Sequence, residues 1–275
     1  YSVTALLSDY KAKYRKVDNP SGLLSEPYVG KNVGEIWGYR IDGLFKTTEE
    51  AQAYAAGVDL TEVCWDYFRT DAGEYGRGIQ AGDLKYLDLN GDNKVNGGAG
   101  TLSDPGDKVV IGNSTPRYNY GLNISLGWMG FDFSAFFQGV GKMDWYPAND
   151  NIKFWGPYVR PFASFVPKNF MNDVWSEDNP NAYFPRARAY SARDSKHSLR
   201  ESNDRYLQDL AYCRLKNLTF GYTLPQKWIS KVGLEHCRVY FSAENLFYWT
   251  KLRSDFIDPE QAVTNKNNSD AYPYY

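Results

Sequence analysis

Two strand-like segments joined by a very short turn constrain this chain more than any other feature. In residues 118–128 one register carries only large apolar or aromatic side chains, and the other carries only small or polar ones. The first register is Tyr118, Tyr120, Leu122, Ile124, Leu126 and Trp128, and the second is Asn119, Gly121, Asn123, Ser125 and Gly127. Met129 and Gly130 form the turn, and residues 131–138 alternate in a similar way. The period of two predicts an antiparallel hairpin with one apolar face.

A second hairpin is predicted downstream. The apolar register of its first strand is Leu218, Phe220, Tyr222 and Leu224. Pro225 ends this strand, and residues 226–233 are typical of a short helical turn. The partner strand covers residues 237–244 and carries Arg238 and Glu244 on its polar face. Because an unpaired buried charge is costly, this face suits a wet lumen better than a dry core.

Three further elements are predicted upstream. Residues 1–8 alternate weakly and indicate another strand. Residues 34–45 indicate a strand with a bend marked by glycine. Residues 48–57 form an alanine-rich helix in our prediction, with Thr48 as its N-cap and Gly57 at its end.

The connections and the aromatic content favour a membrane barrel over a soluble β-protein. Aromatic residues make up 17% of the chain. The strand at 118–128 has about the 9–11 residues of a membrane strand and aromatic residues at both ends. The turns within the hairpins are short, whereas residues 141–210 form a long polar connection, and this asymmetry is typical of outer-membrane barrels. No apolar run approaches the ~20 residues of a spanning helix, so any membrane insertion must use strands.

Several segments then carry a family resemblance. They are GEIWGYRIDGLFKTTEEA (34–51), GDLKYLDLNGDNKV (82–95), IGNSTPRYNYGLNISLGWMGFDFSAFFQG (111–139), YCRLKNLTFGYTLPQKWISKVGL (212–234) and RVYFSAENLFYWTKL (238–252). Together, in this order and spacing, they resemble the C-terminal barrel region of SusC/RagA-type TonB-dependent transporters of Bacteroidetes. The resemblance covers nearly the whole chain.

The resemblance implies an all-β fold: one arc of a multi-pass outer-membrane barrel of about 22 strands, with long extracellular loops and a plugged lumen. Residues 1–275 would belong to the C-terminal portion of that barrel, with the plug domain, the TonB-binding segment and the terminal strand outside this chain. It further implies nutrient import with a SusD-like surface lipoprotein as partner and TonB as energy source. Oligosaccharides are the expected substrates, with peptides as the other class. The formal charge of −2 indicates no nucleic-acid partner.

A loop rich in aspartate and asparagine is the sharpest candidate metal site. Its members are Asp88, Asn90, Asp92, Lys94 and Asn96, which match positions 1, 3, 5, 7 and 9 of a calcium loop, with the lysine supplying its carbonyl oxygen. Position 6 is Asn93 rather than glycine, and position 12 is Ala99 rather than glutamate, a role that Asp104 or Asp107 would have to take. The same composition also suits an ordinary turn. We predict a structural Ca²⁺ or Mg²⁺ here.

Aromatic and basic side chains in the long connection are candidate binding residues. The aromatic candidates for substrate contact are Trp145, Trp155, Tyr158 and Trp175, because aromatic faces stack on sugar rings or pack on peptide side chains. The alternative is packing within the loops or against the lipoprotein. The basic cluster is Arg186, Arg188, Arg193, Lys196 and Arg200. We interpret it as a solvated face paired with Asp194, Glu201 and Asp204.

The sequence gives no support for catalysis. It has no nucleophile elbow, P-loop or zinc-protease motif, and a carboxylate pair such as Glu74 and Asp83 has no fixed separation. The rival to the transporter is a soluble or cell-surface carbohydrate-binding β-sandwich with a structural calcium, and a β-rich glycosidase domain is weaker still. In a sandwich, the apolar strand residues would be buried against a second sheet. In a barrel, they would form an exposed outward band.

Overall fold

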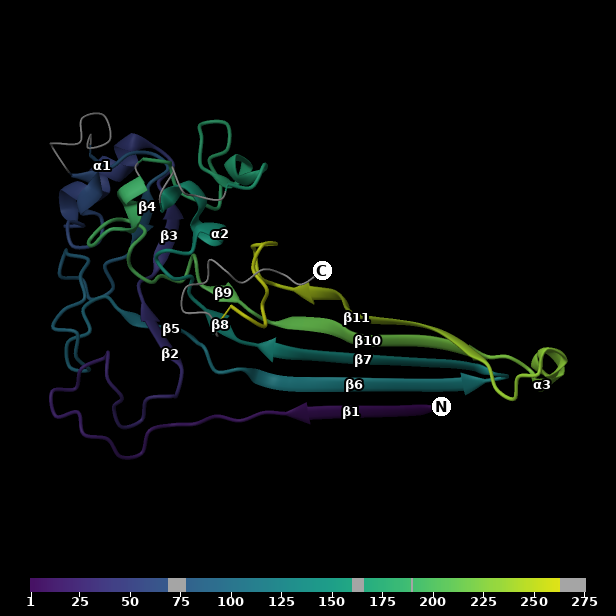
Figure 1. Cartoon of the computed structure of the whole chain (residues 1–275). Coiled ribbons are helices and arrows are strands. Elements are labelled where there is room, and N and C mark those ends of the chain that lie inside the picture. The colour runs from purple at the N-terminus through teal and green to yellow at the C-terminus, as the bar shows by residue number, and fades with distance from the viewer. Residues whose placement is uncertain (69–77, 160–165, 189, 263–275) are drawn as a thin grey trace.

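Five long antiparallel strands form the largest sheet, in the order β1-β6-β7-β10-β11 (Figure 1). Their bounds are Ser2–Ser8 (β1), Arg117–Trp128 (β6), Phe131–Lys142 (β7), Tyr212–Thr223 (β10) and Arg238–Thr250 (β11). The structure is a computed structural model that describes residues 1–68, 78–159, 166–188 and 190–262. The predicted hairpins are confirmed, and three of the four strands that form them extend four to six residues beyond the predicted ends, away from the turns.

The turns within the two hairpins, β6–β7 and β10–β11, lie at the same end of the sheet. Met129 and Gly130 both have positive φ, 48° and 89°, as a two-residue hairpin turn of type I′ requires. The other hairpin closes through α3 (Gln226–Ile229) and a 3₁₀ turn (Ser230–Val232), which confirms the predicted helical turn. The asymmetry of short turns at one end and long connections at the other is therefore a feature of the structure (Figure 1).

The long connections fold into a separate lobe at the opposite end of the sheet. We call the described residues within 34–113 and 143–211 the lobe. Its strands pair as three two-stranded sheets: β2 (Glu35–Gly38) with β5 (Val109–Asn113), β3 (Ile41–Leu44) with β4 (Leu84–Tyr86), and β8 (Asp144–Trp145) with β9 (Gln208–Asp209). Its helices are α1 (Thr48–Gly57), α2 (Ile152–Trp155) and 3₁₀ turns at Trp65–Tyr67, Gly156–Tyr158, Phe170–Asp173 and Tyr190–Arg193.

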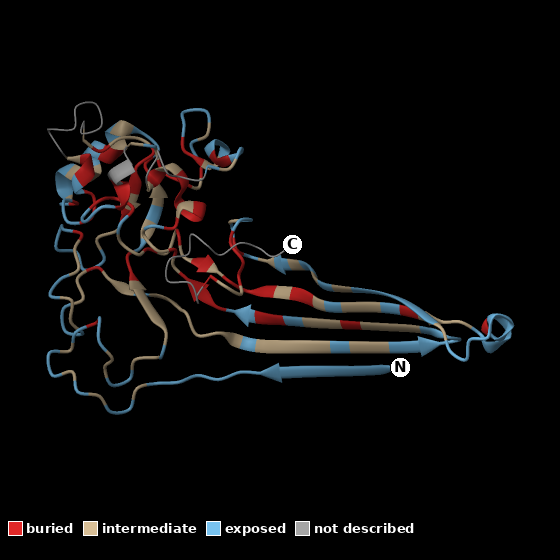
Figure 2. Ribbon diagram, in the orientation of Figure 1, coloured by how far each residue is buried: buried red, intermediate tan, exposed pale blue. Residues whose placement is uncertain are grey.

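The hydrophobic core lies mainly in the lobe and not in the large sheet (Figure 2). Its largest fully buried side chains include Phe45, Tyr67, Tyr86, Trp155 and Tyr206. The connection at residues 141–210 is therefore not a set of solvated loops, because its aromatic residues supply much of this core. None of the helices in the described residues has the length and apolar character needed to cross a membrane.

Two local predictions need correction. Residues 34–45 do not form one bent strand but two, β2 and β3, and each pairs in a different sheet. The helix cap is Thr47 rather than Thr48: Thr47 is extended, with φ −131° and ψ 159°, and its side chain accepts a hydrogen bond from the Glu50 amide at 3.1 Å. The geometry is the usual one for an N-cap, one residue earlier than predicted.

The register of the large sheet separates its side chains into two faces. The apolar face consists of Val3, Ala5, Leu7, Tyr120, Leu122, Ile124, Leu126, Trp128, Phe131, Phe133, Ala135, Phe137, Cys213, Leu215, Leu218, Phe220, Tyr222, Val239, Phe241, Ala243, Phe247 and Trp249. The opposite, polar face carries mainly Asn, Ser, Thr and Gly, with Asp132 on β7 and Arg238 on β11.

Asp132 and Arg238 form an ion pair across an intervening strand. The guanidinium of Arg238 donates to both carboxylate oxygens of Asp132, at 2.9 and 2.5 Å. Gly221 of β10 lies between them, and a Cβ there would come within 2.6 Å of both side chains. Glycine at this position therefore lets one ion pair link β7 to β11.

Replacing Gly221 by alanine is expected to displace this ion pair. The ion pair is exposed and contributes little, so the steric contact of the new Cβ should account for most of the fall in the free energy of unfolding. The matched control is Gly127→Ala, in the same row of the polar face, where the nearest atom to a new Cβ is 3.9 Å away. Urea unfolding of the full-length protein in detergent would measure both variants, and equal midpoints would contradict the prediction.

Candidate functional site

The apolar face of the large sheet is exposed. Trp128, Phe241 and Trp249 have 70%, 59% and 55% of their surface accessible. Leu122, Ile124, Leu126, Phe131 and Phe133, which a sandwich would bury, are all half-buried or exposed. No second sheet lies against the strands in the described part of the chain, and Figure 2 shows the strands standing clear of the lobe. An exposed apolar band of this kind is expected for a barrel wall and not for a sandwich.

Aromatic side chains gather at both ends of the apolar face. At the turn end, the ring centroid of Phe131 lies 4.3 Å from that of Tyr222 and 5.9 Å from that of Phe220. Trp228 of α3, just beyond this end, is 61% exposed. At the lobe end, the centroids of Phe247 and Trp249 are 5.0 Å apart. Only the row of Ile124, Ala135, Leu218 and Ala243 has no aromatic side chain, so aromatic rings are concentrated toward both ends of the face, as membrane interfaces favour.

The four aromatic residues predicted to contact substrate are buried in the lobe. Trp145, Trp155, Tyr158 and Trp175 are only 8%, 0%, 3% and 8% exposed. The Arg193 guanidinium lies 3.8 Å above the ring of Trp155, and the Tyr158 hydroxyl donates to the Pro185 carbonyl oxygen at 2.6 Å. Their place in the structure is therefore that of packing residues. Contact between these four and a substrate stays a prediction.

The predicted solvated face is confirmed for Lys196 and Arg200, which are exposed, but not for Arg188 and Arg193. The side chain of Arg188 is 7% exposed and pairs with Asp83, and Arg193 is 4% exposed. Arg186 lies 4.4 Å from the centroid of Trp175. The predicted acidic partners bind other residues: Glu201 pairs with Lys108, and Asp204 pairs with Arg40. Arg186, Arg188 and Arg193 instead lie within an aromatic core, where their planar guanidinium groups stack on rings.

Buried carboxylates tie the lobe together. Burial raises the pKa of Asp83 to about 6, although the Arg188 guanidinium acts in the opposite direction. Burial also raises the pKa of Asp66, whose oxygens accept from the amide and hydroxyl of Ser198 at 2.9 and 2.8 Å. Asp83 therefore forms an ion pair with Arg188. Glu74, the other carboxylate considered as a catalytic pair with Asp83, lies outside the described residues.

The aspartate and asparagine loop folds as a set of tight turns. Asp88 accepts from the amides of Gly91 and Asn93 at 2.7 and 2.9 Å, and Asp92 accepts from that of Lys94 at 2.8 Å. Asp107, fully buried, accepts from the amides of Leu89, Asn90 and Asn96 and closes the loop. In the described residues no three His, Cys, Asp or Glu side chains are grouped as metal ligands. The Asn side chains and the Lys94 carbonyl remain the further oxygens that a cation would need.

The sequence reasoning missed a buried ionic cluster on the polar face of the sheet. Arg214, 3% exposed, pairs with Asp258 at 2.7 Å and with Glu260 at 3.0 Å. Glu260 also pairs with Lys216 at 2.8 Å and accepts from the Tyr212 hydroxyl at 2.9 Å. Burial would raise the pKa of Glu260, but these partners outweigh it and hold the pKa below its usual value. The cluster fixes residues 253–262, which we call the strap, on the polar face.

No signal in the sequence pointed to this cluster. A β-bulge between Leu215 and Asn217 interrupts the alternation of β10. Because of the bulge, Arg214 lies on the polar face instead of sharing a face with Leu218 and Phe220. The position of the strap depends on this irregularity.

The chain is similar in sequence to TonB-dependent receptors. No protein-family model matches the chain. It is 28% identical over 240 residues to TonB-dependent receptor P3 of Formosa agariphila, and 27% identical over 241 residues to TonB-dependent receptor P26 of the same organism. Each alignment covers 87% of this chain and 20% of the relative, so the chain spans about a fifth of the length of these receptors.

Solved structures of the RagAB peptide transporter are also similar. One matches with a TM-score of 0.49 and 16% identity, over 91% of this chain and 22% of that chain. The 'open-open' state of the RagAB peptide importer matches with a TM-score of 0.49 and 17% identity, over 94% and 24%. The relatives named here are receptors and transporters rather than enzymes. The sequence similarity to the Formosa proteins bears out the resemblance to TonB-dependent receptors.

Proposed function

We propose that this chain forms part of the wall of an outer-membrane barrel through which a TonB-dependent transporter imports a nutrient. The observation that carries the proposal is the exposed apolar face that runs unbroken across five strands. Monomeric soluble proteins rarely expose apolar patches larger than a few hundred Å². Contact with lipid accounts for such a face, and the polar face then lines the lumen.

The dimensions of the strands support this assignment. β6 and β7 each have 12 residues, which at about 3.3 Å per residue makes them about 40 Å long. At the tilt of about 35–45° found in membrane barrels, such a strand rises about 30 Å, the thickness of the hydrocarbon core. The aromatic side chains at both ends of the apolar face would then lie at the two interfaces. The lobe would face the cell exterior and the short turns the periplasm.

The edges of the sheet support a larger barrel. β1 and β11 each have one edge without a strand partner among the described residues. Unpaired backbone groups are costly in lipid, so further strands must pair with both edges. We assign residues 1–275 to the C-terminal portion of a plugged barrel of about 22 strands. The plug domain, the TonB-binding segment and the remaining strands would come from other parts of the transporter.

Partner and substrate follow from the same assignment. The lobe would present the extracellular surface on which a SusD-like lipoprotein closes. The cargo would be an oligosaccharide or a peptide, and TonB would supply energy through the plug. Among the described residues, the ion pairs on the polar face include Asp132 with Arg238, and Arg214 with Asp258.

The carbohydrate-binding sandwich is the weaker alternative. It needs a second sheet over the apolar face and an exposed aromatic platform. The apolar face is uncovered in the described residues, and the four candidate aromatic residues of the lobe are buried. Both observations favour the transporter.

A structural cation at the aspartate and asparagine loop is a separate proposal. Asp88, Asn90, Asp92 and Asn96 present side-chain oxygens, and Lys94 presents its carbonyl, around one short loop. The loop is exposed, except for the half-buried Asp88 and Asn96 and the buried Val95. A Ca²⁺ or Mg²⁺ ion here would stabilise the lobe without taking part in transport.

Placing a charge on the apolar face is expected to impair membrane assembly. Leu122 lies near the middle of β6 on this face, and its neighbour Asn123 lies on the polar face. Leu122→Arg should cost about 2–4 kcal/mol if the side chain meets lipid at mid-depth. Asn123→Arg, the matched control, should be tolerated. The measurement is the amount of folded full-length protein in purified outer membranes. A soluble β-protein would show equal, membrane-independent yields for both variants, and that result would reject the proposal.

Metal content should depend on Asp88. We expect about one Ca²⁺ or Mg²⁺ per untreated full-length molecule at this loop, which a chelator removes with a fall in the melting temperature. Asp88→Ala should remove that ion and the response to chelator. Asp178→Ala, at an exposed aspartate outside the loop, is the control. Metal analysis showing the same content in the wild type and both variants would exclude the site.

A further inference from the structure

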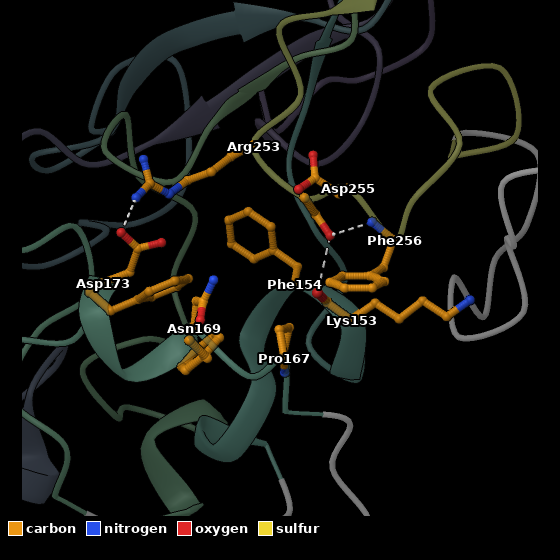
Figure 3. A pocket seen from close by; sticks show the side chains of 11 residues that line it. Lys153, Phe154, Pro167, Asn169, Asp173, Arg253, Asp255 and Phe256 are labelled. Carbon is orange, nitrogen blue, oxygen red and sulfur yellow. Dashed lines mark hydrogen bonds and ion pairs between the residues drawn. The ribbon is translucent and has the colours of Figure 1, made fainter. Parts of the chain in front are cut away.

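A pocket lies between the lobe and the strap (Figure 3). Its volume is about 160 Å³. One wall comes from α2 and the 3₁₀ turn at Phe170–Asp173, with Phe184 beside them, and the other comes from residues 253–256 of the strap. The pocket is therefore formed by segments that the sequence places about 70–100 residues apart.

Aromatic rings form the inner wall of the pocket. Phe154, Phe170 and Phe184 are 3%, 7% and 3% exposed. The centroid of Phe184 lies 5.8 Å from that of Phe154 and 5.0 Å from that of Phe170, so the three rings pack as one unit. Phe256, 38% exposed, stands on the strap side. Since these rings are held by the core of the lobe, the wall is formed before any ligand arrives.

The rim of the pocket is polar and held in place. Arg253 donates to the Asp173 carboxylate at 2.6 Å, and its guanidinium lies 3.9 Å from the centroid of Tyr183. The Ser254 hydroxyl donates to the Lys153 carbonyl at 3.2 Å and accepts from the Phe256 amide at 3.3 Å (Figure 3). These bonds join the strap to the lobe at the mouth of the pocket.

The pocket lies on the lumen side of the sheet in the proposed barrel. Asp258 and Glu260 follow the pocket wall of the strap, residues 253–256, by two and four residues. Their ion pairs with Arg214 hold the strap on the polar face. The polar face is the one that we assign to the lumen. A cargo moving from the extracellular end into the barrel would therefore pass this pocket.

We propose that this pocket binds one large apolar side chain, the size of phenylalanine or leucine, of a peptide cargo. The inference rests on the proposed transport function and narrows its substrate to peptides. A cavity of about 150 Å³ lined by apolar side chains accommodates benzene, so the volume suits one such side chain. The Arg253–Asp173 pair and Asn169 at the rim offer donors and acceptors to the amide groups of a peptide.

A sugar fits this pocket less well. A buried hydroxyl that finds no hydrogen-bond partner loses its solvation without compensation, and a pyranose ring brings several hydroxyls. The apolar part of the lining consists of phenylalanine rings and Pro167, and of the polar lining residues Asp173, Arg253 and Ser254 are already bonded to other groups of the rim. The pocket therefore selects for an apolar group, and the polar groups remain at its mouth.

The test compares peptides with the full-length transporter in detergent. Two synthetic octapeptides of glycine and serine would differ at one central position, phenylalanine or alanine, and binding would be measured by calorimetry. We expect the phenylalanine peptide to bind about 10-fold or more tightly. Asn169→Trp, which fills the pocket from its rim, and Phe256→Ser should both abolish this preference. Leu102→Ser, at an exposed apolar residue away from the pocket, should retain it.

The outcomes separate this inference from the proposed function. Equal affinity for the two peptides, or a preference unchanged in Asn169→Trp and Phe256→Ser, overturns the pocket assignment. Binding of oligosaccharides alone, by a protein that resides in the outer membrane, also overturns it and leaves the transporter in place. Absence of the wild-type protein from outer membranes rejects the transporter itself. A preference lost in both pocket variants, whose amount in the membrane matches that of Leu102→Ser, supports the inference.

Discussion

The pairing register of the five long strands is the constraint on which the rest of the structure depends. Because side chains alternate with a period of two, a slip of one residue in any pair would move its apolar side chains to the other face. The register holds Ala5, Leu122, Phe137, Leu215 and Phe247 in one row, from one edge of the sheet to the other. With one face apolar, lipid can cover it, and with the other mainly polar, apart from side chains such as Phe136 and Tyr240, a wet lumen can lie behind it.

The bulge near Leu215 lets one strand serve both the membrane and the lobe. At this point β10 has one residue more than β7, and β11 has one residue more than β10. Asn245, in the irregular part of β11, has a positive φ of 51°. The shift returns Cys213 and Leu215 to the apolar face and places Arg214 on the polar face. Arg214 then binds Asp258 and Glu260, and those bonds hold the strap that forms one wall of the phenylalanine pocket. A local irregularity of the backbone thus determines what covers the polar face of the sheet.

The sequence predicted the regular part of the fold because alternation is a local signal. Both hairpins, the strand at residues 2–8 and the helix at 48–57 follow from side-chain periodicity and capping residues that lie close together in the chain. The prediction of β10 began only at Asn217, since the bulge interrupts the alternation there. The lobe could not be predicted because its core joins residues far apart, such as Asp83 with Arg188 and Tyr86 with the Ser198 carbonyl. Nothing within a short window of sequence marks these contacts.

The same difference between local signals and long-range contacts explains why the sequence indicated exposed tryptophan and arginine residues in the long connection, where the structure has several buried ones. Prolines and charges in residues 141–210 indicate exposed loops when they are considered one segment at a time. In the structure Arg193 covers the ring of Trp155 and Arg186 covers that of Trp175, so each pair satisfies a charge and closes an apolar gap together. These pairs pack beside the buried aliphatic side chains of the lobe, among them Leu60, Leu84 and Leu199. In the proposed barrel, the packed core would let Phe154, Phe170 and Phe184 present a preformed wall to the cargo, whereas loops free in solvent would have to be ordered at each binding event.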